Sequence, residues 1–292
     1  MIVMHDIRRI VVIYNPKSTG WSLELSERFQ RRAERRLDVP VEVVATKHRG
    51  HAEELARTYA ELNDGTMIVC CSGDGGYHEV VNGVLSSKNP TALLGLLPGG
   101  NANDHYSHMH TPFLYRRLAE REITTIDVLR IRSSAGWERY AHSYAGLGMT
   151  AELNEVLQHY EFHPLREVGL VVSHILKTRP VIVEVNGKRA RYDNIIFLNA
   201  GRMSKFVKAA ANASITDGQF ELILFKKGSA TEFARYVVRA ATVGMDNAQQ
   251  RKTFTFTCKQ DMAIQMDGEQ HQLVKGEKIT VTCIPEKLNC II

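Results

Sequence analysis

The chain has 292 residues, of which 44% are hydrophobic and 24% are charged, and its formal net charge is +5. This composition excludes a disordered or low-complexity protein, and the length fits two modest domains better than one large domain. So mild a charge attracts anionic groups without choosing between nucleic acid, lipid and nucleotide. No apolar run approaches the ~20 residues of a membrane-spanning helix, and no signal-type core is present, so we expect a soluble protein.

The cysteine content indicates a reducing compartment. The five cysteines are Cys70, Cys71, Cys258, Cys283 and Cys290. Their odd number and the lack of any C-x-x-C spacing argue against a closed disulfide framework. We therefore expect reduced thiols and an intracellular, cytoplasmic protein.

The N-terminal part alternates buried-strand runs with helical patterns. Strands are predicted at 10–14, 41–45, 67–71 and 92–97, and helices at 22–37, at 51–62 and after residue 76. Strand, glycine turn and helix form the repeating unit of a parallel sheet, which binds ligands at the carboxyl ends of its strands.

The helix predicted at 22–37 is amphipathic and basic. Its apolar series comprises Leu25, Phe29, Ala33 and Leu37, and the opposite face carries Arg28, Arg31, Arg32, Arg35 and Arg36. A solvated surface face is the more common use of such a helix, and docking to a membrane is the alternative.

From about residue 123 the pattern changes to short alternating runs between turn residues, which predicts an antiparallel β region. The runs lie at 124–131, 138–144, 181–185, 194–199, 220–225, 253–257, 263–266 and 278–284. Two helical patterns, at 152–177 and 231–242, interrupt them. We place one domain at 1–123, a second at 124–292, and the hinge near 122–125.

Three polar or glycine-rich segments follow predicted strands of the first domain. They are Asn15–Gly20, Ser72–Gly76 and Pro98–Asp104. Glycines between a strand and a helix let backbone amides face an anion, and neighbouring parallel strands would bring these loops to one edge. Phosphate is the expected ligand. The first segment also fits an N-terminal helix cap.

Standard nucleotide-binding signatures are absent from the sequence. It contains no G-x-x-x-x-G-K-[ST], no protein-kinase H-R-D and no dinucleotide G-x-G-x-x-G. Nucleotide binding would therefore use a different scheme, and a Rossmann oxidoreductase is disfavoured.

The loops and several further motifs resemble one known family. SGDGGYHEVVNG at 72–83 resembles the GGDGT-x-x-E-V-x-N-G signature of the diacylglycerol kinase catalytic family, and PGGNAND at 98–104 resembles its P-x-G-T-x-N-D. Further matches in the right order are YNPKSTG, Thr46 with Gly50 and His51, IDVLRI, NASITDGQFEL and MDGEQ. The combination is much more specific than any single loop.

This resemblance implies both a fold and an activity. The fold would be α/β plus all-β: an N-terminal α/β domain with a parallel sheet, similar to NAD kinases and phosphofructokinases, and a C-terminal antiparallel β-sandwich with inserted helices. Residues 281–292 would return to the first domain. The activity would be that of an ATP-dependent lipid kinase, with ATP and lipid meeting in a cleft.

The resemblance also implies site residues. ATP contacts fall on Asn15, Pro16, Lys17, Ser18, Thr19, Gly20, Thr46, Gly73, Asp74, Gly75, Gly76, Tyr77, His78, Glu79, Gly100 and Asn101. Magnesium and its waters would be organised by Asp74, Asp104 and Asp127, because clustered phosphate charge needs a hard cation held by oxygen ligands. A structural metal site would use Asp217 with the carbonyls of Ser214 and Gln219.

In the family's D-G-E motif a carboxylate accepts the proton of the lipid hydroxyl. Here either Asp267 or Glu269 would act as this base. Without the resemblance, Asp267 and Gly268 would be interpreted as a hairpin turn.

Five positions, Ser72, Gly76, Tyr77, His78 and Asn101, depart from the family pattern and leave three hypotheses open. The threonines usual in the two glycine loops are replaced by Gly76 and Asn101, and SGDG followed by His78 resembles sphingoid-base kinases. The hypotheses are a diacylglycerol kinase, a kinase of a sphingoid base or another lipid alcohol, and a catalytically weak lipid- or nucleotide-binding protein.

We expect a lipid partner at a membrane surface and no nucleic acid. Edge strands could pair two subunits into a homodimer.

Overall fold

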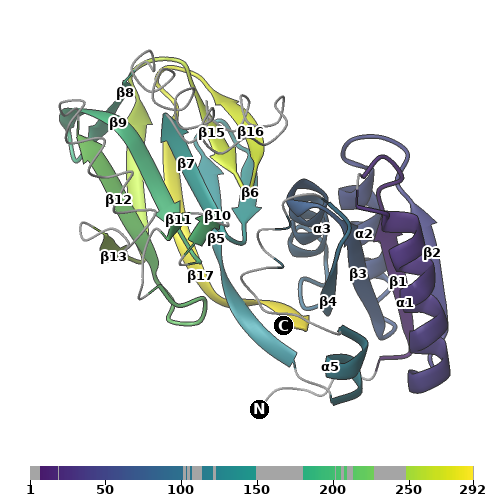
Figure 1. Cartoon of the computed structure of the whole chain (residues 1–292). Coiled ribbons are helices and arrows are strands. Elements are labelled where there is room, and N and C mark those ends of the chain that lie inside the picture. The colour runs from purple at the N-terminus through teal and green to yellow at the C-terminus, as the bar shows by residue number, and fades with distance from the viewer. Residues whose placement is uncertain are drawn as a thin grey trace. The chain divides into compact units, whose positions relative to one another are not determined.

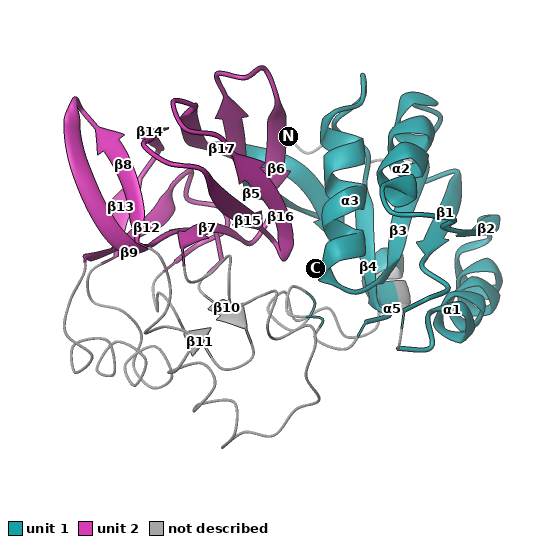
Figure 2. Ribbon diagram, turned by 90° about the horizontal axis from the view of Figure 1, so that it is seen from above, with its two compact units in different colours: residues 1–128, 285–292 teal, residues 129–284 magenta. Residues whose placement is uncertain are grey.

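The structure, a computed structural model, forms two compact units (Figures 1 and 2). It describes residues 7–18, 20–100, 103, 106, 114–120, 123–148, 180–200, 202–204, 207–208, 213–226 and 248–291. Unit 1 comprises residues 1–128 with 285–292, and unit 2 comprises residues 129–284. No helix in these described ranges is long and apolar enough to cross a membrane.

Unit 1 is an α/β unit with a parallel sheet. Its elements are β1 (Arg9–Tyr14), α1 (Ser22–Leu37), β2 (Val41–Ala45), α2 (His51–Glu61), β3 (Thr66–Ser72), α3 (Asp74–Leu85), β4 (Leu94–Pro98), α5 (Leu114–Glu120) and the start of β5 (Ile123–Ser133). The order β2-β1-β3-β4 places the strand ends that precede the glycine loops at one edge.

The sheet of unit 1 has an apolar layer on each face. On one face, Phe29 and Ala33 of α1 belong to a core cluster with Ile10 and Met67 of the strands. On the other, α2 packs closely on α3, and a Cβ at Gly83 would lie 2.3 Å from the Glu53 carbonyl oxygen. This close helix contact therefore requires a glycine at position 83.

Unit 2 is an antiparallel β unit. Its strands are the remainder of β5, β6 (Glu138–Ala141), β7 (Tyr144–Gly148), β8 (Val181–Val185), β9 (Lys188–Leu198), β10 (Arg202–Ser204), β11 (Val207–Lys208), β12 (Phe220–Lys226), β13 (Gln249–Arg251), β14 (Thr253–Cys258), β15 (Met262–Met266), β16 (Glu269–Leu273) and β17 (Lys278–Ile291). Phe197 anchors its core, with ring centroids 5.8 Å from Phe220 and 6.4 Å from Phe256.

Strand β17 belongs to both units. Its first part pairs with β14 in unit 2, and its last residues join unit 1, where Cys290 pairs with Leu94 of β4 in parallel. Within unit 1 the Thr125 hydroxyl donates to Asn289 Oδ1 at 3.0 Å, and Asn289 Nδ2 donates to the Thr91 carbonyl at 2.9 Å. These contacts fix the returning segment, which the sequence placed at 281–292 and the structure begins at 285.

The predicted fold class, an α/β domain plus an antiparallel β domain, is confirmed. One predicted strand was wrong: the run at 138–144 is not continuous, because β6 ends at Ala141 and β7 begins at Tyr144. The helical patterns at 152–177 and 231–242 lie outside the described residues. All five cysteines are buried as free thiols, and burial raises the pKa of Cys71 to about 11.

Candidate active site

Three loops of unit 1 meet through their backbones at the carboxyl ends of β1, β3 and β4. The Gly20 amide donates to the Gly99 carbonyl at 3.1 Å, and the Gly99 amide donates to the Ser72 carbonyl at 3.1 Å. The Ser18 hydroxyl also donates to the Gly99 carbonyl. The structure therefore brings together the loops that the sequence predicted to share an edge.

Glycine is needed where these loops touch. A Cβ at Gly20 would lie 2.6 Å from the Gly99 carbonyl oxygen, and a Cβ at Gly100 would lie 2.4 Å from the Gly73 Cα. Helix α3 begins directly after this contact, and its N-cap residue, Gly73, supplies no side-chain cap. A helix N-terminus that begins after a glycine at a meeting of loops is suited to an anion such as phosphate.

Position 76 is a glycine because Ser72 fills the space beside it. A Cβ at Gly76 would lie 2.3 Å from the Ser72 hydroxyl oxygen and 2.6 Å from the Ser72 Cβ. Rotating the serine would relieve the first contact but not the second. The two departures from the family pattern at these positions are thus one coupled change, and Ser72 keeps a hydroxyl in the loop.

The described residues of the segment 15–20 do not cap α1. The N-cap of α1 is Trp21, which makes no side-chain capping bond, and the Ser22 hydroxyl donates to the Asn15 carbonyl at 2.6 Å. Asn15 Oδ1 accepts the amide of exposed Lys17 at 2.9 Å, which shapes the loop itself. The capping interpretation was therefore wrong, because the loop is held to β1 and to Gly99.

The loop after β2 joins the same edge. The Thr46 amide donates to the Tyr14 carbonyl at 2.9 Å, and the Gly50 amide donates to Glu79 Oε1 at 2.9 Å. Glu79 on α3 therefore ties the loop after β2 to the helix that follows the SGDG loop.

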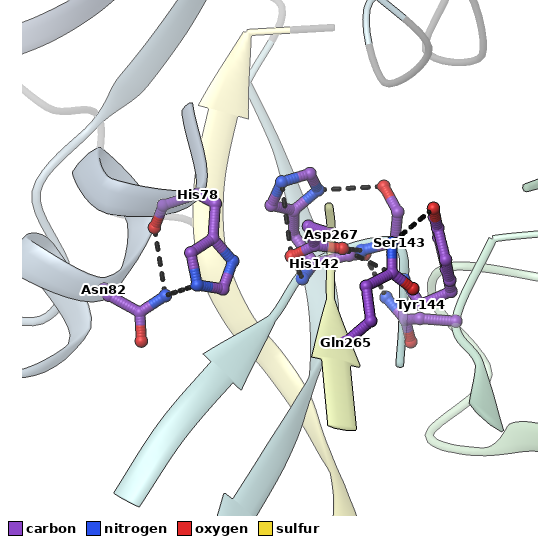
Figure 3. Close-up of polar contacts among 8 residues, drawn as sticks. His78, Asn82, His142, Ser143, Tyr144, Gln265 and Asp267 are labelled. Carbon is purple, nitrogen blue, oxygen red and sulfur yellow. Dashed lines mark hydrogen bonds and ion pairs between the residues drawn. The ribbon is translucent and has the colours of Figure 1, made fainter. Parts of the chain in front are cut away.

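Tyr77 and His78 are buried, with 1% and 6% of their surfaces exposed. Asn82 Nδ2 lies 3.2 Å from His78 Nε2 and donates to the His78 carbonyl at 2.9 Å (Figure 3). Any contact of these two residues with a nucleotide would have to use the main chain.

The predicted magnesium residues have different surroundings. Asp74 is half-buried in the first turn of α3, whereas Asp127 is fully buried and its Oδ1 accepts the Glu286 amide at 2.9 Å. Asp127 thus also holds the returning C-terminal segment. The predicted contacts Thr19, Asn101 and Asp104 lie outside the described residues. Their neighbour Asn103 shapes the second loop, because its Oδ1 accepts the Gly100 amide at 2.9 Å.

In unit 2 the D-G-E motif forms the predicted hairpin turn between β15 and β16. Asp267 and Gly268 have φ values of 48° and 98°, as a two-residue turn with both residues in the left-handed region requires. The Asp267 carboxylate is buried and accepts three consecutive backbone amides, those of His142 at 2.8 Å, Ser143 at 2.9 Å and Tyr144 at 3.0 Å (Figure 3). A buried carboxylate whose two oxygens already accept three amides is poorly placed to accept a substrate proton.

Buried polar side chains surround this carboxylate. His142 Nε2 lies 3.4 Å from Asp267 Oδ2, and His142 Nδ1 lies 2.9 Å from the Ser143 hydroxyl. Asn199 Nδ2 donates to the His142 carbonyl at 2.9 Å, and Gln265 Nε2 donates to the Tyr144 hydroxyl at 2.9 Å (Figure 3). The sequence did not reveal this cluster, because the run 138–144 predicts a single strand. The adjacent polar pair His142 and Ser143 was the available signal.

Glu269, the first residue of β16, differs from Asp267. It pairs with Met266 across the hairpin and is only partly buried. Of the two candidate bases, Glu269 is therefore the less buried.

The proposed structural metal loop, 214–219, precedes β12. The Gln219 amide donates to Oδ1 of exposed Asp217 at 3.0 Å. Nearby Glu221 is 4% exposed, and its Oε2 has no hydrogen-bond donor among the described residues. Burial, reinforced by the Asp217 charge, raises the pKa of Glu221 to about 7. This excess of oxygen ligands and negative charge fits a cation. Within the described ranges no three His, Cys, Asp or Glu side chains form a metal cluster.

Comparison with known proteins shows what this chain is similar to. The model of the diacylglycerol kinase catalytic domain matches residues 9–131, which hold all three glycine-rich loops. The chain is similar to the diacylglycerol kinase catalytic domain family. It is 26% identical to a diacylglycerol kinase of Bacillus subtilis over 94% of both chains, and 24% identical to that of Staphylococcus saprophyticus over 90% of this chain and 89% of the relative.

Two further similarities bear on the diacylglycerol kinase assignment. A plant protein, sphingoid long-chain bases kinase 1 of Arabidopsis thaliana, is 36% identical over 103 residues, which cover 32% of this chain and 13% of that protein. The crystal structure of a putative diacylglycerol kinase from Bacillus anthracis shares the fold, with a TM-score of 0.72 at 18% identity over 97% of both chains.

Proposed function

We propose that the chain is an ATP-dependent lipid kinase that transfers the γ-phosphate of ATP to the hydroxyl of diacylglycerol and forms phosphatidic acid. The lipid kinase class follows from the catalytic domain family and from the full-length relatives. Diacylglycerol as the acceptor is supported by the names of those relatives. The observation that carries the proposal is the backbone contact of three glycine loops beside the start of α3.

The phosphate loops would bind ATP mainly through main-chain amides. Phosphoryl transfer needs little covalent chemistry from the protein, so alignment and charge neutralisation are its main tasks. The amides at the start of α3 supply fixed positive dipoles, and Lys17 supplies a mobile charge on the neighbouring loop. Magnesium would neutralise phosphate charge when bound, and Asp74 is the described carboxylate in this loop to hold it or its waters.

Glu269 would act as the general base, and Asp267 would act as its positioning residue. The Asp267 carboxylate fixes the turn that precedes β16 by accepting three amides, so it sets the direction in which Glu269 leaves the hairpin. Glu269 would take the proton of the lipid hydroxyl as this oxygen attacks the γ-phosphorus, the bond to the β–γ bridging oxygen breaks and ADP leaves.

A radiolabelled-ATP assay across dispersed lipids tests the substrate. Product with diacylglycerol is expected, and product with sphingosine alone would favour the sphingoid-base kinase that the SGDG loop and the plant relative indicate. No product with any lipid alcohol would leave a binding protein and contradict the kinase proposal.

Replacing the proposed base tests the mechanism. Glu269→Gln removes the proton acceptor but keeps the shape of the side chain, so kcat is expected to fall by about 10²–10⁴-fold. A matched control is Glu184→Gln, which removes an equal charge from a surface ion pair with Lys259 and should leave the rate nearly unchanged. A normal rate for Glu269→Gln in folded protein would remove Glu269 from the mechanism.

A further inference from the structure

Exposed apolar side chains gather at the start of α1. Within the described part of unit 1 the exposed large hydrophobic residues are Trp21, Leu23 and Leu62, at 73%, 45% and 50% of their surfaces. Two of them lie within three positions of each other. Neither the sheet core nor the proposed phosphate chemistry gives these two side chains a role.

The backbone at Trp21 is held in an unfavourable conformation. Its φ and ψ of 60° and 41° lie in the left-handed region, which is costly for a residue with a Cβ. A large apolar ring that stays in water on a strained backbone adds a second cost. An exposed ring on a strained backbone is the kind of feature that a binding surface explains.

Trp21 lies at the same sheet edge as the phosphate loops. The hydroxyl of Ser22, the next residue, donates to the Asn15 carbonyl at the end of β1. The loop after β2 starts at that edge as well, because β2 runs parallel to β1 and the Thr46 amide donates to the Tyr14 carbonyl.

Exposed basic side chains lie in the loops at this edge. Lys17 follows β1, and Lys47 and Arg49 follow β2, and all three side chains are exposed. The exposed acidic residues in the first turns of α1 and α2 are Glu24 and Glu54, so the basic groups outnumber them. An aromatic and an aliphatic side chain together with cations is the combination that binds the interface of an anionic bilayer.

We propose that Trp21, Leu23, Lys47 and Arg49 form a docking rim that seats unit 1 on an anionic membrane surface. The tryptophan and leucine would enter the headgroup layer while Lys47 and Arg49 contact lipid phosphates. The choice of a membrane as partner rests on the proposed lipid kinase function, because its acceptor resides in a bilayer. Docking by this edge would hold the phosphate loops next to the membrane.

The arginine face of α1 is a different surface. Arg31 pairs with Glu27 at 3.5 Å, and Arg35 Nε donates to the Arg31 carbonyl at 2.9 Å, so part of its charge is used within the helix. It also lacks an exposed large hydrophobic side chain. The face therefore provides a control with the same charges but without the apolar pair.

Vesicle flotation without ATP tests the docking rim. The vesicles contain equimolar phosphatidylcholine and phosphatidylglycerol, with phosphatidylcholine alone as the neutral comparison. Trp21→Ala is expected to weaken binding to the anionic vesicles by about tenfold. The double variant Lys47→Glu with Arg49→Glu should weaken it by more than tenfold, and added salt should weaken wild-type binding.

The matched control is Arg31→Glu with Arg35→Glu, which makes the same charge change on the arginine face. The docking rim predicts near-normal binding for this control. An equal loss in both double variants would show general charge attraction and overturn the proposal. No binding of the wild type to anionic vesicles, or equal binding to neutral ones, would also overturn it.

Fluorescence locates the contact. Phospholipids brominated in the acyl chains should quench the wild-type emission more than that of Trp21→Phe, because only a ring inside the bilayer meets the bromine. Equal quenching in the two proteins would contradict the proposal, as would quenching of Trp21 by ATP instead of lipid.

Activity in detergent micelles separates this inference from the proposed function. The docking-rim variants at Trp21, Lys47 and Arg49 should phosphorylate diacylglycerol in micelles at the wild-type rate, because they leave the phosphate loops intact. Vesicle binding without kinase activity would overturn the function and keep the docking rim. Kinase activity together with vesicle binding that Trp21→Ala does not weaken would overturn the docking rim and keep the function.

Discussion

The phosphate loops of unit 1 and the D-G-E turn of unit 2 are built in opposite ways. The loops touch backbone to backbone, and added Cβ atoms at Gly20 or Gly100 would collide with main-chain atoms. The turn is organised by one side chain, because the Asp267 carboxylate collects three amides from a distant segment. The loops therefore depend on the absence of side chains, and the turn depends on a single charged group.

This difference decides how each site tolerates change. A glycine loop is disrupted by any added atom, whatever its chemistry, because the contact is steric. The turn keeps its shape with any group that accepts all three amides, and it is disrupted by a group of equal size that donates. The glycine loops should therefore be damaged by added volume. The Asp267 turn should be damaged by a change from acceptor to donor even at constant volume.

The largest effect is expected from Asp267→Asn. One carboxylate oxygen becomes an NH₂ group, which cannot accept an amide and would face a donor. We expect the free energy of unfolding to fall by about 2–4 kcal/mol, because buried amides lose a charged acceptor. Urea denaturation of this variant and of Glu269→Gln measures the effect.

The Glu269 variant is the matched control for Asp267→Asn, since it makes the same chemical change two residues away on a partly exposed side chain. Its stability should stay within about 0.5 kcal/mol of the wild type. Equal stability of Asp267→Asn and wild type would show that the three amides do not depend on the carboxylate.

A smaller effect, with a change of sign, is expected at Gly76. In the wild type Gly76→Ala should destabilise unit 1 by about 1–3 kcal/mol, because the new Cβ would meet the Ser72 side chain. In a Ser72→Gly background the collision is gone, and alanine should be neutral or stabilising, since it favours a helix over glycine by about 1 kcal/mol. A double-mutant cycle read by denaturation measures the coupling. Additive effects would show that the two positions do not share space.

The sequence predicted that the three glycine-rich loops meet at one edge, because their pattern is local. Each loop lies directly after a strand and before a helix or polar segment, and parallel order alone brings such loops to one edge. The contact of Gly20 with Gly99 required no information about individual side chains.

The surroundings of Asp267 could not be predicted in the same way. Its partners His142, Ser143 and Tyr144 lie more than 120 positions earlier in the chain. The sequence pattern of an antiparallel sheet does not predict which turn contacts which strand end. The strand predicted across 138–144 was interrupted for the same reason, because those amides bond to the carboxylate instead of continuing a ladder. The coupling of Ser72 to Gly76 could not be predicted either. In the sequence the two residues are separate departures from the family pattern, and only the structure shows that they share one space.

The smallest effect is expected at Glu221. Its carboxyl is buried, and it lies near the charge of Asp217. Its pKa is about 7 in the folded protein, above the ordinary value of 4.5. At a pH below the ordinary pKa, Glu221 is protonated in both the folded and the unfolded protein, so it does not reduce the free energy of unfolding. Stability is therefore lost as the pH rises from the ordinary value through the folded value, and above it the full cost of a buried charge remains.

Glu221→Gln removes this cost. In chelated buffer the variant should be more stable than the wild type by about 1–2 kcal/mol near pH 8, and the difference should vanish near pH 5. Asp217→Asn, which removes only the smaller cause, should show a weaker trend in the same direction. Thermal unfolding across this pH range measures both variants. A difference independent of pH would mean that Glu221 is already ionised in the folded protein throughout, and that burial does not control its charge.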